Sequence, residues 1–197
     1  MFITFEGIDG CGKTTQIELL KSYFEENGFK VILIREPGST KISEQIRDIL
    51  LNSNNFDISS ETETLLFASA RSQVIKEIII PSLNENKIVL CDRFIDSTIA
   101  YQGFGRGIDL KNIYIINEFA IQNIYPDFTF FIDITIEESI NRLKGSNLDR
   151  MESAGNKFYN EVRKGYLDLA SQFPERIYKL NGTLSIKDIH HEIISII

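Results

Sequence analysis

Eight consecutive residues near the start of the chain have the types and spacing of a phosphate-binding loop. They read Gly7-Ile8-Asp9-Gly10-Cys11-Gly12-Lys13-Thr14, which matches the pattern GxxxxGK[ST]. Glycines at these positions let the backbone curl until successive N–H groups point at an anion. In such loops the lysine reaches the β- and γ-phosphates of a nucleotide, and the next hydroxyl binds Mg²⁺. We therefore predict a triphosphate site, with Lys13 catalytic, at Gly7, Ile8, Asp9, Gly10, Cys11, Gly12, Lys13, Thr14 and Thr15.

A carboxylate follows an apolar run later in the chain, where Lys87-Ile88-Val89-Leu90-Cys91 leads into Asp92. An acid at the end of a buried strand, downstream of a phosphate loop, can help to organise Mg²⁺. Asp92 also fits the N-cap of a following helix. We favour the metal role, together with Thr14, because the phosphate loop creates a need for such a group.

Arginines outside the phosphate loop are candidates for gripping a second anionic ligand, because a guanidinium binds phosphate bidentately. The arginines in segments that the expected topology brings to one edge of the sheet are Arg35, Arg47, Arg71, Arg93 and Arg106. A surface arginine without a ligand is the commoner case. Phe67 and Arg71 are four residues apart and share a helical face. They offer an aromatic plane beside a planar donor, a pair suited to a nucleobase, although Phe67 fits an ordinary core position equally well.

Short apolar runs and amphipathic segments alternate along the chain, and they must position these side chains. We expect strands at 2–6, 31–34, 87–91, 128–134 and 177–180, and helices at 15–27, 42–51, 60–80, 110–122, 136–143, 158–173 and 186–197. Such alternation predicts an α/β fold of the P-loop type, a three-layer sandwich in which helices cover both faces of a five-stranded parallel sheet. Ligands bind at the carboxyl ends of the strands in such sheets.

Three local signals refine this prediction. Ser60 with Glu63 fits a capping box at the start of a long helix, and Thr135 with Glu138 fits another. Pro81 is expected to end or kink the long helix. The segment 94–109 is glycine-rich and polar, and too long for a simple turn, so we expect a functional loop there.

Composition excludes several classes of protein. A net charge of −7 argues against a general nucleic-acid binder. No apolar stretch approaches the ~20 residues that span a bilayer, and the N-terminus lacks the pattern of a signal peptide. Cys11 and Cys91 suit a reducing cytoplasm. The chain of 197 residues is long enough for one domain, and we expect a single kinase domain over 1–197 with a lid at about 144–156.

The phosphate loop alone does not separate GTPases, ATPases and small-molecule kinases. A GTPase needs Asn-Lys-x-Asp to recognise its base, and both Asn86-Lys87 and Asn156-Lys157 lack the aspartate. A kinase of a small acceptor is the interpretation that we favour. Two alternatives stay open, namely a kinase for another acceptor, such as a deoxynucleoside or a different nucleotide, and a nucleotide-dependent switch that binds a protein partner.

Several motifs in order resemble those of bacterial-type thymidylate kinases over nearly the whole chain. They are the phosphate loop with Asp9 at its third position, Arg35-Glu36-Pro37-Gly38, Leu65-Leu66-Phe67 with Arg71, Asp92-Arg93-Phe94 with Ser97 and Ala100-Tyr101-Gln102-Gly103, and Leu148-Asp149-Arg150-Met151-Glu152. The resemblance implies ATP- and Mg²⁺-dependent phosphorylation of dTMP to dTDP, a step in dTTP synthesis for DNA replication. It also implies a homodimer, and the helices that begin near Ser60 and Leu110, both rich in Ile, Leu and Phe, are the candidate isologous interface.

The resemblance also implies roles for individual residues. Asp9 accepts the sugar 3′-hydroxyl and lies near the acceptor phosphate, Arg93 holds that phosphate, and Arg71 donates to thymine O4. Phe67 stacks on thymine, and Tyr101 lies against the deoxyribose and disfavours a 2′-hydroxyl. The full set of implied dTMP-binding residues is Asp9, Arg35, Pro37, Arg47, Phe67, Arg71, Arg93, Ser97, Thr98, Tyr101 and Gln102.

The lid departs from the family pattern. Members without a basic residue in the phosphate loop place a catalytic arginine in the lid, and this lid is one residue shorter than usual and poor in arginine. Its positive charge comes from Arg142, Lys144 or Arg150, and the sequence does not choose among them. With Lys13, Asp9 and Arg93, these three complete the expected catalytic set. Residues 181–183 are a positional guess for the adenine site.

Overall fold

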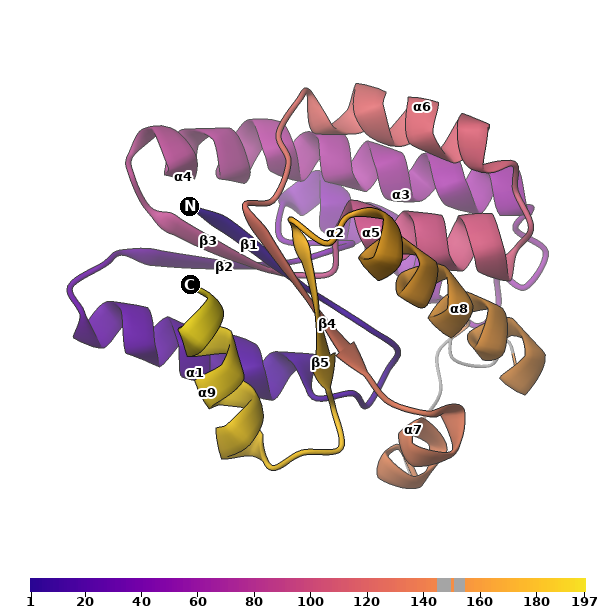
Figure 1. The fold of residues 1–197 in the computed structure, drawn as a ribbon. Coiled ribbons are helices and arrows are strands. Elements are labelled where there is room, and N and C mark those ends of the chain that lie inside the picture. The colour runs from indigo at the N-terminus through magenta and orange to yellow at the C-terminus, as the bar shows by residue number, and fades with distance from the viewer. Residues whose placement is uncertain (145–149, 151–154) are drawn as a thin grey trace.

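The centre of the fold is a five-stranded parallel sheet, which confirms the predicted fold class. The computed structural model describes residues 1–144, 150 and 155–197 (Figure 1). The strands are β1 (Phe2–Glu6), β2 (Val31–Arg35), β3 (Ile88–Asp92), β4 (Phe128–Asp133) and β5 (Ile177–Asn181). Their order in the sheet is β2-β3-β1-β4-β5, and every neighbouring pair is parallel. All five carboxyl ends therefore meet at one edge.

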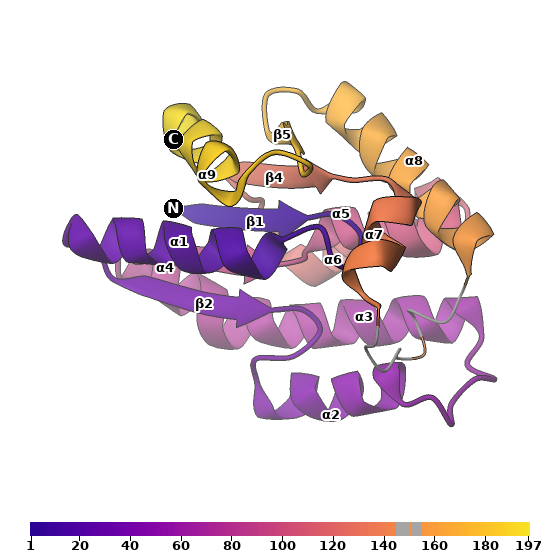
Figure 2. The same cartoon turned by 90° about the horizontal axis from the view of Figure 1, so that it is seen from below.

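Helices cover both faces of the sheet, and Figure 2 shows α1 and α9 on one face with α3 and α6 on the other. The longer helices and α7 are α1 (Lys13–Glu26), α2 (Lys41–Leu51), α3 (Ser60–Val74), α6 (Leu110–Ile121), α7 (Ile136–Arg142), α8 (Asn156–Gln172) and α9 (Ile186–Ile196). Helix α2 packs on α3, while α8 packs on β4 and β5. The middle of the sheet is dry, since Ile3, Phe5, Phe130 and Ile132 have no exposed surface. This burial on both faces explains the continuous apolar runs in the sequence.

The long helix from Ser60 does not end at Pro81. It continues as the π-helical segment η1 (Ile75–Ile79) and then as α4 (Ile80–Asn84), where Pro81 occupies the first turn. Proline lacks a backbone N–H donor, and the π-helical turn comes just before it. The three segments form one run along the sheet in Figure 1.

The capping box predicted at Ser60 and Glu63 is wrong, whereas Thr135 is an N-cap as predicted. Ser59 is the N-cap of α3, and its hydroxyl accepts from the N–H of Thr62. Glu63 is buried and bonds to side chains of other segments. A local pattern cannot show that a side chain has stronger partners far away in the sequence.

The glycine-rich segment 94–109 is mostly helical and not a loop. It forms α5 (Ile95–Thr98) and the π-helical segment η2 (Ile99–Gly105), which packs on α8. A Cβ at Gly103 would lie 2.5 Å from Leu110 Cδ2, and one at Gly105 would lie 2.6 Å from Phe158 Cε2. These glycines therefore permit close packing, a use that composition alone does not distinguish from flexibility.

No helix in the described part of the chain combines the length and the apolar character needed to cross a membrane.

Candidate active site

The phosphate loop lies between β1 and α1, as its pattern predicts. Gly7, Gly10 and Gly12 all have positive φ angles, and a Cβ at Gly7 would lie 2.6 Å from the carbonyl oxygen of Ile132. Gly12 caps α1 without a side-chain bond, so the first N–H groups of that helix are available to an anion. Lys13 curls back over the loop, where its Nζ donates to the carbonyl of Gly7 at 3.3 Å.

Two pockets open at the carboxyl edge of the sheet and share four residues. The inner pocket is lined by Asp9, Glu36, Pro37, Arg47, Leu51, Phe67, Arg71, Arg93, Ser97, Thr98, Tyr101 and Gln102. The P-loop pocket is lined by Asp9, Gly10, Gly12, Lys13, Thr14, Thr15, Arg35, Glu36, Arg47, Asp92, Arg93, Arg142 and Leu143. The shared residues are Asp9, Glu36, Arg47 and Arg93. Two ligands bound in these pockets would therefore meet beside two arginines.

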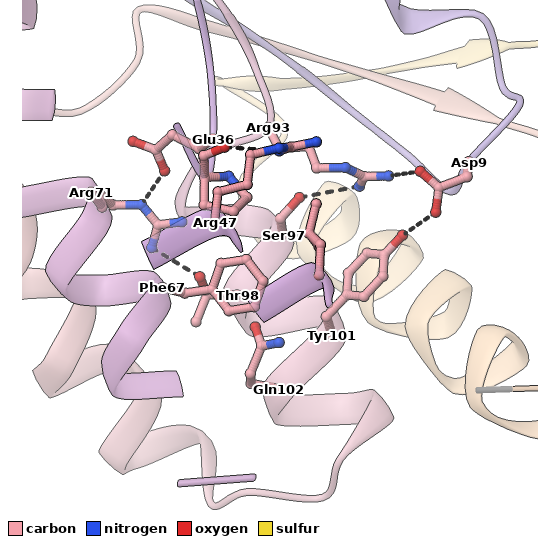
Figure 3. A pocket seen from close by; sticks show the side chains of 12 residues that line it. Asp9, Glu36, Arg47, Phe67, Arg71, Arg93, Ser97, Thr98, Tyr101 and Gln102 are labelled. Carbon is pink, nitrogen blue, oxygen red and sulfur yellow. Dashed lines mark hydrogen bonds and ion pairs between the residues drawn. The ribbon is translucent and has the colours of Figure 1, made fainter. Parts of the chain in front are cut away.

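Arg93 and Asp9 form an ion pair at this junction. Arg93 Nη2 donates to Asp9 Oδ1 at 2.5 Å (Figure 3). Its Nη1 donates to the carbonyl of Gly7 at 2.8 Å. Burial opposes ionisation of Asp9, but the charges of Arg93 and Lys13 outweigh it and hold the pKa of Asp9 below its ordinary value. The backbone of Arg93 has a φ of 69°, a conformation that costs about 1–3 kcal/mol and that these contacts hold in place.

Arg71 forms one wall of the inner pocket and is 2% exposed. Its Nε donates to Glu36 Oε2 at 2.7 Å, and its Nη2 donates to the carbonyl of Phe94 at 3.0 Å. Its Nη1 donates to Thr98 Oγ1 at 2.8 Å and to Asn117 Oδ1 at 2.9 Å. A guanidinium has five N–H donors, so these four bonds leave one Nη2 hydrogen for a ligand.

The rest of the inner pocket combines aromatic and polar walls. In Figure 3 the Phe67 ring lies in the middle of the pocket with Arg71 on one side and Tyr101 on the other. Phe67 is half-buried and lines the cavity, so it is not an ordinary core residue. Thr98 and Gln102 are each 1% exposed and present polar atoms to the same space.

Arg35 and Arg47 both bind the carbonyl oxygen of Pro37. Arg35 Nη1 donates to it at 3.1 Å and Arg47 Nη1 at 2.8 Å. Arg35 also forms a surface ion pair with Glu44 at 3.0 Å. Arg47 reaches both pockets, whereas Arg35 lines only the P-loop pocket.

The side chains of Thr14 and Asp92 lie in the P-loop pocket. Asp92 Oδ1 is buried and has no hydrogen-bond partner among the described residues. An unsatisfied buried carboxylate oxygen in the same pocket as a hydroxyl suits a hard cation that is also bound by phosphate oxygens. The donor set therefore fits Mg²⁺ held jointly by protein and nucleotide.

The three cations proposed for the lid lie in different places. Arg142 lines the P-loop pocket, where its Nη1 donates to the carbonyl of Gly10 at 3.2 Å and its Nη2 to that of Gly182 at 2.9 Å. Lys144 is exposed and is not among the residues that line either pocket. Arg150 is buried and pairs with Glu63 at 2.7 Å. Among these three, only Arg142 lies at the P-loop pocket; the other lid positions, 145–149 and 151–154, lie outside the described residues.

Arg106, which we expected at the same edge as the other arginines, lines neither pocket. Its guanidinium also pairs with Glu63, at 3.1 Å. Residues 181–183, the positional guess for adenine, lie next to Arg142 through the Gly182 carbonyl.

Several polar residues that support the site were not among the site residues predicted from the sequence. They are Glu6, Glu36, Glu63, Asn117, Tyr159 and Tyr166. Glu6 accepts hydrogen bonds from the Phe94 N–H at 2.7 Å and from the hydroxyls of Ser97 at 2.6 Å and Tyr166 at 2.9 Å. Burial and the nearby charge of Asp96 raise the pKa of Glu6 to about 7. An acid within an apolar strand was the available signal for Glu6.

Comparisons with known proteins agree across the whole chain. The family model for thymidylate kinase matches residues 5–193. A thymidylate kinase from Thermosipho africanus is 48% identical over 197 residues, covering 100% of this chain and 97% of the relative. One from Thermoanaerobacter sp. (strain X514) is 46% identical over 196 residues, covering 100% and 96%. The crystal structure of thymidylate kinase from Ehrlichia chaffeensis is 40% identical, covers 100% of this chain and 97% of its own, and gives a TM-score of 0.82.

Proposed function

The chain belongs to the thymidylate kinase family, and we propose that this enzyme transfers the γ-phosphoryl group of ATP to dTMP, giving ADP and dTDP. The observation that carries the proposal is the meeting of the inner pocket and the P-loop pocket at Asp9, Arg47 and Arg93. A nucleoside monophosphate in the inner pocket would direct its phosphate toward a triphosphate on the loop. The product would supply dTTP for DNA replication.

In the proposed reaction, an oxygen of the dTMP 5′-phosphate attacks the γ-phosphorus of ATP, and the bond from that phosphorus to the β-γ bridging oxygen breaks. The attacking oxygen is already anionic, so the step needs no strong general base. Positioning and charge stabilisation supply the catalysis. Arg93, Arg47 and Arg35 bind the acceptor phosphate, and Asp9 orients Arg93 through the 2.5 Å ion pair.

Lys13 binds the β- and γ-phosphates, and Arg142 supplies the second positive charge. Its place at the P-loop pocket supports Arg142 over Lys144 and Arg150. Thr14 and Asp92 would hold Mg²⁺, which when bound neutralises charge on the phosphate oxygens. The unsatisfied Oδ1 of Asp92 supports this assignment.

The inner pocket binds the nucleoside. Phe67 stacks on thymine, and the remaining Nη2 hydrogen of Arg71 donates to thymine O4. Cytosine carries an amino group at this position, which would meet the arginine donor head-on. Ser97, Thr98 and Gln102 line the base edge, while Tyr101 lies against the deoxyribose and disfavours a 2′-hydroxyl. Asp9 and Pro37 complete the contacts near the sugar and phosphate.

We also propose that the enzyme is a cytoplasmic homodimer of single-domain chains. Exposed apolar side chains on two adjacent helices support the dimer, namely Leu65 on α3 and Ile115 and Phe119 on α6, which are 54%, 59% and 85% exposed. An apolar face on two packed helices suits an isologous interface. The free thiols of Cys11 and Cys91 suit a reducing compartment.

The test is ADP release with ATP, Mg²⁺ and a panel of nucleoside monophosphates and nucleosides, without any protein partner. We expect fast turnover with dTMP and weak turnover with dCMP and with purine monophosphates. Turnover only with a nucleoside would assign a different kinase. Absence of turnover with every acceptor would instead support a nucleotide-dependent switch.

A further inference from the structure

The amide of Gln102 can face the inner pocket in two ways, with its oxygen or with its nitrogen. We propose that Glu63 decides between them and so acts as a positioning residue for base selection. Glu63 holds the amide nitrogen of Gln102, which leaves the amide oxygen to accept the N3–H of thymine. The proposal rests on the proposed function, because it concerns how that same pocket selects its pyrimidine.

The contact between the two side chains is short and dry. Gln102 Nε2 donates to Glu63 Oε1 at 2.9 Å, and each residue is 1% exposed. An ionised carboxylate has no hydrogen to donate, so only the amide nitrogen can bond to it. Turning the amide would set two acceptors face to face in a buried place, where an unmade hydrogen bond costs most. The chemistry of Glu63 therefore fixes the orientation of Gln102.

Two arginines keep Glu63 ionised. Arg106 donates to both carboxylate oxygens through Nε and Nη2, each at 3.1 Å, and Arg150 Nη2 donates to Oε2 at 2.7 Å. Burial opposes ionisation, but hydrogen bonds from Arg106 and Gln102, together with the charges, hold the pKa of Glu63 below its ordinary value. Glu63 is thus an acceptor without a proton to donate at neutral pH.

This arrangement gives the pocket a donor and an acceptor on separate elements. Figure 3 shows Arg71, from α3, and Gln102, from η2, pointing into the same space around Phe67. The Arg71 donor suits O4 of thymine, and the Gln102 acceptor suits the adjacent N3–H. Cytosine reverses both groups, because it has an amino group at C4 and a bare N3. Uracil has the same two groups as thymine, so Glu63 should affect selection against cytosine and not against uracil.

The variant Glu63→Gln tests the inference, because a glutamine there can donate to Gln102 and lets its amide turn. We would measure kcat/KM and dissociation constants of dTMP, dUMP and dCMP for the parent and the variant. The dissociation constants still give a ratio of dTMP to dCMP affinity if the turnover of dCMP is too slow to detect. The preference for dTMP over dCMP should fall about tenfold, the effect of about one misplaced hydrogen bond. The preference for dTMP over dUMP should stay constant.

A matched control is Glu77→Gln, since Glu77 accepts from Gln73 in an exposed pair of the same kind. It should change none of the ratios. A second variant, Gln102→Met, leaves the ion pairs of Glu63 in place and should weaken dTMP and dUMP while sparing dCMP. If Glu63→Gln does not fold, an unchanged ratio of dTMP to dCMP in Gln102→Met would overturn the proposal, because Glu63 acts only through Gln102.

Equal loss for all three pyrimidines, or no change, would overturn the role of Glu63. A parent that prefers a purine monophosphate to dTMP would instead reject the proposed function.

Discussion

Replacing Arg71 should unfold part of the enzyme population as well as weaken base binding. Arg71 pairs with Glu36 at 2.7 Å, and the two side chains are 2% and 3% exposed. Arg71→Met keeps most of the side-chain volume but leaves the Glu36 carboxylate buried without that cation. Removing one partner of a buried pair costs about 3–5 kcal/mol. Typical domains have only about 5–15 kcal/mol of stability, so we expect a large fall in the free energy of unfolding.

The pH dependence has a definite sign. Burial already raises the pKa of Glu36 above its ordinary value, although Arg71 opposes the shift. Without Arg71 this pKa rises further in the folded state and stays ordinary in the unfolded state. The folded variant then binds more protons, so its stability falls as pH rises above the ordinary range for a carboxyl group. The deficit of Arg71→Met relative to the parent should be larger at pH 8 than at pH 5.

Urea denaturation at both pH values measures this effect, and the double variant Arg71→Met with Glu36→Gln controls for it. Because the double variant removes both charges, it should recover at least about 2 kcal/mol and lose the pH dependence. It should still discriminate poorly between dTMP and dCMP. A single variant within about 1 kcal/mol of the parent at both pH values would refute the reasoning. Loss of activity in an Arg71 variant supports base recognition only after correction for the folded fraction.

Three further outcomes follow from the geometry. The stability of Glu6→Gln relative to the parent should rise by about 2 kcal/mol as the pH increases from 5.5 to 8. The pKa of Glu6 is raised to about 7 in the folded parent, so the parent loses stability as Glu6 ionises, and glutamine cannot ionise. A stability difference that stays constant with pH in denaturation experiments would contradict this. Arg142→Ala should lower kcat by about 10²–10³ with little change in KM for dTMP, and Lys144→Ala should be nearly neutral; the reverse order in steady-state kinetics would assign the charge to Lys144. Phe119→Lys should produce monomers in sedimentation experiments, whereas Phe56→Lys, at an equally exposed phenylalanine outside α6, should not; dimers in both would remove α6 from the interface.

Much of the fold and part of the site could be predicted because their signals are local. The phosphate loop is a contiguous pattern, and the periodicity of apolar residues predicts the strands and helices. Parallel strands bring their carboxyl ends together, so the topology alone gathers Asp9, Asp92 and Arg93 at one edge. Family motifs added the inner-pocket residues Phe67, Arg71 and Gln102, which do line one cavity.

Other features depend on partners that are distant in the chain. The predicted capping box at Glu63 was overridden by bonds to Gln102 and to Arg150, which is 87 residues away. Glu6 accepts a hydrogen bond from Tyr166, which is 160 residues away in the sequence. Arg71 donates to Asn117, which is 46 residues away. The choice of Arg142 over Arg150 at the P-loop pocket depended in the same way on where each guanidinium is bound.

The sequence by itself determined the α/β architecture, the phosphate loop and the candidate side chains for binding a nucleotide, because each is encoded by residue type and short spacing. Only the tertiary structure decided which hydrogen of Arg71 is left for a ligand, which way Gln102 faces and which acids are held ionised. Those properties depend on burial and on bonds between segments that meet only when the sheet and its helices have packed together.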